Sequence, residues 1–296
     1  MEAGKIMTIT SQHVFQQYHY DSFIPPKPED DSDPVRAERL RVREELTWLD
    51  CQLWPFIKAQ NWNIHRHRQK EHYVSSYHHI WKSMAGDTSD RPDGVGRWQP
   101  IVNNIRSMWL HYGKSQGQLD SFQNQMATKT HSAHGLDTEE YYNAFYAHTR
   151  IQFYINTIEF RAWLIMTDKT LIDKGILLSN MKNRDYTNKF WDLIQPLIGK
   201  GFFYSKGDSG ISLQPTLQRD HFMKFVRTDR AGLYSGIYKK YDPDSPALLR
   251  ENIVSEMSEN LRLLYPLYDL MAYKGFSSLS SPSTGVSLLK DYFKRL

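Results

Sequence analysis

The sequence predicts an α+β fold, in which an antiparallel sheet of hairpin-connected strands packs against long N- and C-terminal helices. Two amphipathic helical patterns, one near each end of the chain, indicate these helices. Between them, short runs of alternating apolar and polar residues are separated by turn-rich stretches, which is typical of hairpins. The regular alternation of strands and helices found in parallel sheets is missing, so we expect antiparallel pairing.

The amino-acid composition excludes several classes of protein. The chain has 296 residues, of which 40% are hydrophobic and 14% aromatic, enough to bury a core and too apolar for a wholly disordered or fibrous protein. Its start lacks a secretion-signal pattern, and no run is apolar enough to span a membrane. Together with the single cysteine, Cys51, these features predict a cytoplasmic or nuclear protein that is not secreted and has no membrane partner.

Four parts are expected along the chain. They are an acidic, proline-rich arm and linker at 1–34, a single α+β domain at 35–276 with an alternative sub-boundary near 128–138, a serine-rich tether at 277–285 and an amphipathic tail at 286–296. The arm carries two lysines and six acidic residues, a net charge of −4, so the rest of the chain carries +8 although the total is +4. Proline and acidic repulsion favour an extended linker, whereas the aromatic stretch at 14–20 is expected to dock.

The first long helix is predicted to begin at Asp33 and Pro34, a good helix start. Its apolar positions repeat every three or four residues and are Val42, Leu46, Leu49, Leu53, Phe56 and Ile57. Pro55 is expected to kink or end this helix near Trp54. Cys51 is interpreted as a small core residue on its apolar side.

The clearest strand pattern lies at 150–166, where apolar residues alternate with polar and aromatic ones on either side of Asn156 and Thr157. A two-residue turn at these positions would give one apolar face and one polar, aromatic face. The expected opposed pairs on the second face are Tyr154 with Glu159, Gln152 with Arg161, and Arg150 with Trp163.

Weaker patterns predict the other elements. Strands are expected within 71–79, 105–112, 202–204, 210–213 and 233–238, and helices within 118–127, 186–198, 217–226 and 245–271. The last helix repeats its apolar residues along its whole length, so we expect it to pack throughout, with a bend at Pro266.

A histidine and arginine cluster is the most unusual local feature, because five of the twelve histidines lie within 65–79. As a metal site it would use His65, His67 and His72, although neighbouring arginines oppose a dication. As an anion site it would use Arg66, Arg68 and Lys70 to meet phosphates. A third interpretation makes these residues the polar side of an ordinary antiparallel strand.

A second basic region spans 180–240, where eleven basic residues face five acidic ones and aromatic residues are interleaved. The leading hypothesis is therefore a protein that binds DNA or RNA, as a component of a defence, restriction or nucleic-acid-processing assembly. The candidate phosphate-binding residues are Arg66, Arg68, Lys70, Arg150, Arg161, Lys182, Arg184, Lys189, Lys239 and Lys240. The candidate stacking residues are Trp62, Tyr154, Trp163 and Tyr204.

Two other functions are open. One is a metal-dependent phosphodiesterase or nuclease-type hydrolase, with Glu159, Asp168 and His65 as candidate catalytic residues and a divalent metal as its cofactor. The phosphate-loop, dinucleotide-binding and nucleophile-elbow motifs are all missing from the sequence, and no Glu-x-Lys pair occurs. The other is a structural or adaptor subunit that binds a protein partner through the tail at 286–296.

Overall fold

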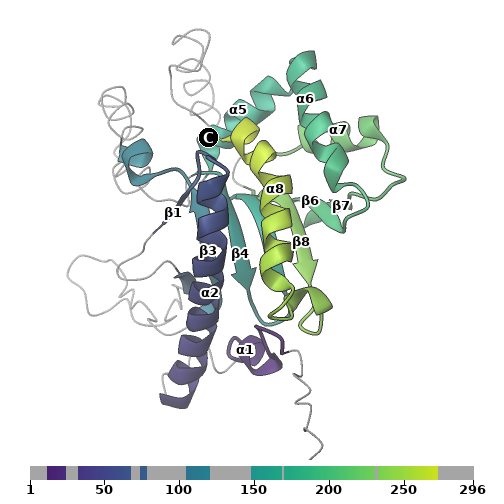
Figure 1. Cartoon of the computed structure of the whole chain (residues 1–296). Helices are drawn as coiled ribbons and strands as arrows, with labels where there is room; N and C mark the ends of the chain where they lie inside the picture. The colour runs from purple at the N-terminus through teal and green to yellow at the C-terminus, as the bar shows by residue number, and fades with distance from the viewer. Residues whose placement is uncertain are drawn as a thin grey trace, which may run out of the picture.

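The computed structural model describes residues 12–24, 33–67, 74–78, 105–120, 148–168, 170–230 and 233–272. These residues form an α+β fold, as predicted: one antiparallel sheet flanked by helices (Figure 1). The strands described are β1 (His65–Arg66), β2 (Val74–His78), β3 (Ile105–Gly113), β4 (Arg150–Ile155), β5 (Phe160–Met166), β6 (Phe202–Lys206), β7 (Ser209–Ser212) and β8 (Ser235–Tyr241). Their order is β1-β3-β4-β5-β8-β6-β7, and β2 also pairs with β3.

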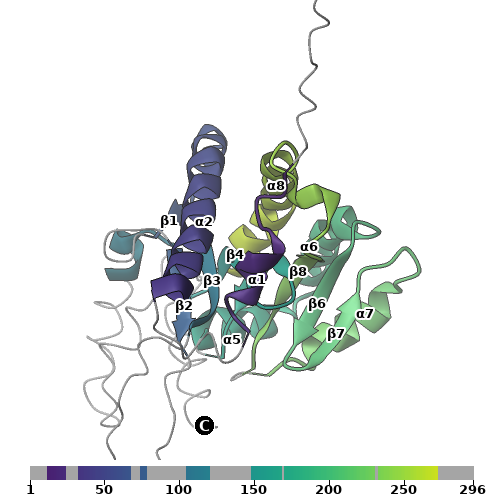
Figure 2. The same ribbon diagram turned by 90° about the horizontal axis from the view of Figure 1, so that it is seen from below.

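Helices line one face of this sheet. The α-helices are α1 (Gln17–Asp21), α2 (Asp33–Ala59), α5 (Leu171–Asn180), α6 (Arg184–Ile194), α7 (Arg219–Arg227) and α8 (Ile253–Met271), with short 3-10 helices η3 (Gln195–Leu197) and η4 (Pro246–Leu248). Helix α2 contacts β3, and α8 contacts β4, β5 and α2. In Figure 2, α1, α2 and α8 lie together on one side of the strands. No helix in the described part of the chain is long and apolar enough to cross a membrane.

The core lies between these helices and the strands. Phe153 of β4, Leu164 of β5, Leu49 of α2 and Leu264 of α8 are fully buried there. Because side chains alternate along a strand, the same alternation that buries Phe153 turns Tyr154 to the other face. This second face carries the candidate site.

The N-terminal arm docks in part, as its aromatic residues predicted. The Phe15 ring stacks on Phe160 of β5 at 4.9 Å. The backbone N–H of Val14 donates to the carbonyl of Leu248, and that of Arg250 donates to Gln12. Residues 12–24 are therefore part of the helical layer. The proposed linker at 25–32, the sub-boundary at 128–138, and the tether and tail at 277–296 lie outside the described residues.

The structure corrects two expectations for α2. Of the two outcomes expected at Pro55, the end of the helix near Trp54 is wrong, because α2 runs on to Ala59. Pro55 is exposed, as is Cys51, whose carbonyl would otherwise accept a hydrogen bond from residue 55, so water can take the place of the missing N–H. Cys51 is accordingly a surface residue and not part of the core.

The β4–β5 hairpin has the predicted faces in a different register. Tyr154 lies opposite Arg161, and Gln152 lies opposite Trp163, a shift of two residues from the expected pairs. The connection is longer than two residues because the Asn156 side chain caps it. Its Oδ1 atom accepts from the backbone N–H of Ile158 at 2.9 Å and from that of Glu159 at 3.0 Å. A shift of two keeps every side chain on its face.

The helical pattern near the C-terminus is divided. Residues 246–248 form η4, and α8 begins only at Ile253, so the predicted single helix from 245 is wrong at its start. Pro266 lies inside α8, which continues beyond it to Met271. Helix α5 was not predicted. Of the helix expected at 118–127, the structure describes only its first residues, which are helical.

Candidate nucleic-acid interface

A row of four aromatic side chains crosses the second face of the sheet on neighbouring strands. We call Tyr154 of β4, Trp163 of β5, Tyr238 of β8 and Phe203 of β6 the aromatic row; all four are partly exposed. The Tyr154 and Trp163 rings are 6.4 Å apart and Trp163 and Tyr238 are 6.1 Å apart, both edge-to-face, and Phe203 stacks on Tyr238 at 5.4 Å. The rings meet because antiparallel pairing places Trp163 opposite Tyr238, and Tyr238 opposite Phe203.

Arg161 lies over two rings of this row. Its guanidinium carbon is 4.4 Å from the centre of the Tyr238 ring and 4.8 Å from that of Trp163. Its Nη2 donates a hydrogen bond to Oε1 of Glu159, whose side chain is only 7% exposed, against 21% for Arg161. The guanidinium therefore extends the stacking surface and is held in place from one side by a carboxylate.

Lys240 supplies an exposed positive charge beside the row. It lies opposite Arg161 in the β5–β8 register and is exposed to solvent. Trp109 of β3 lies opposite Tyr154 and is partly exposed, so aromatic side chains continue from β4 onto β3. This face combines rings with cations, as required to stack bases and attract phosphates.

The other end of the same face is buried and polar. Arg150 is buried and donates from Nε to the Gln152 side chain at 3.2 Å, and burial lowers the pKa of Arg150 to about 10. The rings of His67 and His111 stack at 5.0 Å. Burial, followed by the charge of Arg150, lowers the pKa of His67 to about 4, and burial takes that of His111 well below its usual range. Both imidazoles are therefore neutral at pH 7.

A buried ion pair joins this end of the sheet to α5. The Lys114 ammonium is 3.6 Å from Oδ2 of Asp173, which also accepts from the backbone N–H of Thr149 at 2.7 Å. Burial alone would raise the pKa of Asp173, but Lys114, His148 and the Thr149 amide together hold it below its usual value. This pair fixes α5 against the end of β4 and is a structural feature.

Several predicted binding residues lie on the helix-covered side instead. Arg66 pairs with Asp50 of α2 at 3.0 Å, and Lys239 pairs with Glu256 of α8 at 2.7 Å. Trp62 stacks on Tyr265 of α8 at 4.5 Å. These side chains connect helices to strands, so they are not placed to meet a ligand on the aromatic row.

The remaining predicted residues are not gathered at the row either. Tyr204 is fully buried under α7, and its hydroxyl donates to Asp229. The exposed residues Lys182, Arg184 and Lys189 are in and just before α6, away from the sheet face. Arg68, Lys70 and His72 lie outside the described residues. Of the predicted set, the structure thus brings together Arg161, Lys240, Tyr154 and Trp163.

The candidate catalytic and metal-binding residues do not converge. Glu159 is paired with Arg161, whereas Asp168 follows the opposite end of β5, and His65 is in β1 at the sheet edge. Among the residues that the structure describes, no three His, Cys, Asp or Glu side chains are grouped as metal ligands would be.

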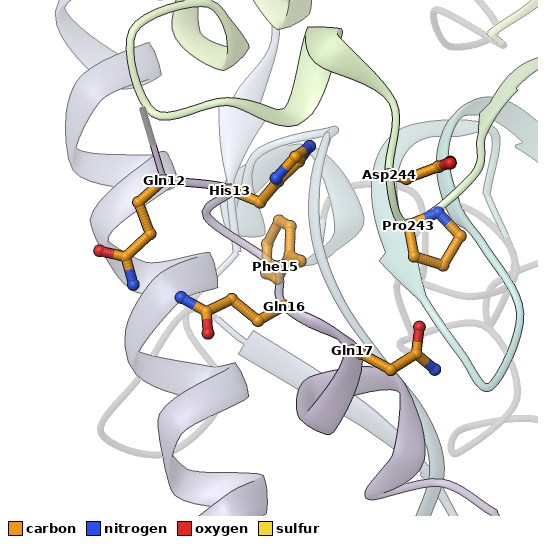
Figure 3. Close-up of a pocket in the computed structure, with 7 residues that line it drawn as sticks. All are labelled: Gln12, His13, Phe15, Gln16, Gln17, Pro243 and Asp244. Atoms are coloured by element: carbon orange, nitrogen blue, oxygen red, sulfur yellow. The ribbon is translucent and has the colours of Figure 1, made fainter. Parts of the chain in front are cut away.

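A pocket of about 380 Å³ lies at the docked arm, between residues 12–17 and the turn at Pro243 and Asp244 (Figure 3). Such a volume suits a small molecule. Its labelled lining is mainly amide and apolar: Gln12, His13, Phe15, Gln16, Gln17, Pro243 and Asp244. With one carboxylate and one imidazole it offers less specific chemistry than the aromatic row.

Two members of the row, Tyr238 and Phe203, were not among the predicted site residues. Both stand among the aromatic residues interleaved with the basic region, and the alternation of Tyr238 with its neighbours in 235–241 was the available signal. What the sequence could not supply was the pairing of β8 with both β5 and β6, which joins them to Trp163.

Comparisons with known proteins do not assign the chain to a family. No protein-family model matches it, and no curated protein matches its sequence. Its function is therefore inferred from the aromatic row and the charges beside it.

Proposed function

We propose that the chain binds single-stranded DNA or RNA across the aromatic row. The observation that carries this proposal is the continuity of Tyr154, Trp163, Tyr238 and Phe203 over four adjacent strands, with the Arg161 guanidinium lying on two of the rings. A sheet face with partly exposed rings can serve as a stacking platform for bases, and each base stacked on a ring contributes about 1–3 kcal/mol.

The nucleic acid is expected to be single-stranded for a physical reason. In a duplex, the flat surfaces of the bases are covered by their neighbours, so aromatic side chains on a sheet cannot reach them. In a single strand they can turn outward onto Tyr154, Phe203 and the Arg161 plane, while Lys240 meets a phosphate.

The two other functions receive less support. In the hydrolase hypothesis Glu159 would bind a metal or act as a base, but it is paired with Arg161, which cannot give up a proton as lysine can. A protein partner for the tail at 286–296, and membership of a larger assembly, remain predictions because that segment lies outside the described residues.

Fluorescence anisotropy tests the proposal directly. Fluorescein-labelled 12-mers of mixed-sequence DNA and RNA are titrated with the protein at low salt, and an unlabelled duplex serves as competitor. We expect the single strands to bind and the duplex to compete poorly. The double variant Tyr154→Ala/Phe203→Ala should weaken binding at least about tenfold, because it removes two stacking surfaces.

Trp62→Ala is the matched control. It also removes a partly exposed ring that stacks on a neighbour, but on the helix-covered side of the sheet. Its affinity should equal that of the wild type. The proposal is wrong if no single strand binds at low salt, or if the double variant binds as tightly as Trp62→Ala.

A further inference from the structure

The backbone of Glu159 is hydrogen-bonded on both sides at the edge of the aromatic row. The Asn156 side chain accepts from its backbone N–H, and the Asn156 N–H donates to the Glu159 carbonyl at 3.2 Å. The neighbouring Ile158 is 66% exposed at the tip of the loop, yet the Glu159 side chain is only 7% exposed. The loop therefore fixes a nearly buried carboxylate beside the stacking surface.

The hydrogen-bonding capacity of this carboxylate is only partly used. Oε1 of Glu159 accepts from Nη2 of Arg161. Within the described part of the chain, Oε2 of Glu159 and Nη1 of Arg161 make no hydrogen bond. Neither of these two atoms is fully buried, so a ligand at the surface can reach both of them. The pair thus offers an acceptor and a donor side by side, next to a guanidinium plane on which a base can lie.

Bases differ in how they match such a pair. Cytosine and adenine each carry an exocyclic amino group beside a ring nitrogen that accepts hydrogen bonds, so the amino group can donate to Glu159 while the ring nitrogen accepts from Arg161. Guanine also has an amino group. Uracil and thymine have none, and their single N–H lies between two carbonyl oxygens, which a carboxylate repels.

From this arrangement we infer that Glu159 and Arg161 read the base: they favour cytosine and adenine over uracil and thymine at one position of the bound strand. The inference rests on the proposed binding of single strands to the aromatic row. In this role Arg161 is a base-contacting residue, and the charge that attracts phosphate comes from Lys240, because Glu159 neutralises the guanidinium.

Cytidine and uridine 12-mers provide the test, because they differ only on the edge that the pair would contact. Fluorescence anisotropy at pH 7.5 should show that the wild type binds the cytidine 12-mer about tenfold more tightly, the discrimination expected of a well-placed pair of hydrogen bonds. Glu159→Gln adds an amide N–H that can meet the uracil carbonyl, so the affinity ratio should fall to about twofold or less.

Two further variants separate base reading from charge and folding. Glu251→Gln makes the same change of charge at an exposed position outside the row and should keep the tenfold ratio. Arg161→Lys keeps the charge but loses the planar fork, so its ratio should also fall, and circular dichroism checks that each variant is folded.

The outcomes distinguish the two proposals. Equal wild-type affinity for the two 12-mers would overturn base reading and leave single-strand binding in place. A ratio that persists in a folded Glu159→Gln protein would also overturn it. Failure of both 12-mers to bind would overturn base reading together with the function on which it rests.

Discussion

The two faces of the sheet are built from the same strands and differ in what covers them. On the helix-covered face, side chains such as Phe153, Leu164 and Ile237 are fully buried, and α8 contacts the strands β4 and β5 that carry the first two. On the other face, Tyr154, Trp163 and Tyr238 remain partly exposed, and the Arg161 guanidinium lies over the last two rings. The first face therefore supplies most of the buried apolar packing, whereas the second face keeps rings that are partly open to solvent.

The largest expected effect comes from adjacent residues on β4. Phe153→Ala should cost about 3–5 kcal/mol of unfolding free energy, because it leaves a cavity among Phe160, Tyr112 and the helices. Tyr154→Ala should cost about 1 kcal/mol or less, since its ring is partly in water, but should weaken single-strand binding. Urea denaturation measures the first quantity and anisotropy the second. Equal losses of stability in the two variants would contradict the conclusion that the helix-covered face is the more important for stability.

A slightly smaller loss of stability is expected at Gly236, which lies under the aromatic row. Its φ is +155°, and a Cβ there would lie 2.1 Å from the Leu164 carbonyl oxygen and 2.9 Å from the Trp163 indole nitrogen. Gly236→Ala should therefore push β8 from β5 and cost about 3 kcal/mol in urea denaturation.

Gly175→Ala in α5 is the control for that change, because a Cβ there meets nothing within 4 Å. It should stabilise the protein by up to about 1 kcal/mol through helix propensity. If the Gly236→Ala protein had the same free energy of unfolding as the Gly175→Ala protein, β8 could not approach Trp163 as closely as the structure shows.

Acid should lower the free energy of unfolding through buried histidines on both faces of the sheet. Burial, followed by the charge of Arg41, lowers the pKa of His19 in α1 to about 4, and that of His67 on the second face is also lowered. A lowered folded pKa means that the unfolded chain binds the proton more readily, so this stability is present above about pH 6.5 and is lost as pH falls toward 4. Between pH 7 and 5, His19 should account for a loss of about 2 kcal/mol.

Urea denaturation at both pH values checks this prediction. His19→Gln should lose about 2 kcal/mol less than the wild type on acidification, although it also removes the hydrogen bond that His19 accepts from the Gln16 N–H. An unchanged loss would show that the pKa of His19 is the same in the folded and the unfolded chain.

The face of the sheet on which a side chain lies could be predicted from the sequence, whereas the residue with which it pairs could not. Alternation in 150–166 assigned Tyr154 and Trp163 to one face, and the assignment held when the register shifted by two, because side chains alternate with period two. Arg66 and Lys239 were selected by charge alone. Their partners, Asp50 and Glu256, come from helices distant in sequence, and local pattern carries no information about such tertiary pairing.

The smallest effect separates two exposed lysines that the sequence could not distinguish. Lys240 lies beside Arg161 on the second face, whereas Lys189 lies on α6, and both were predicted to contact phosphate. If the strand follows the aromatic row, Lys240→Gln should reduce the slope of log affinity against log salt by about 1, because one fewer counterion is released. Lys189→Gln should leave the slope unchanged. The reverse result would place the nucleic acid on the helices and remove the second face from the binding surface.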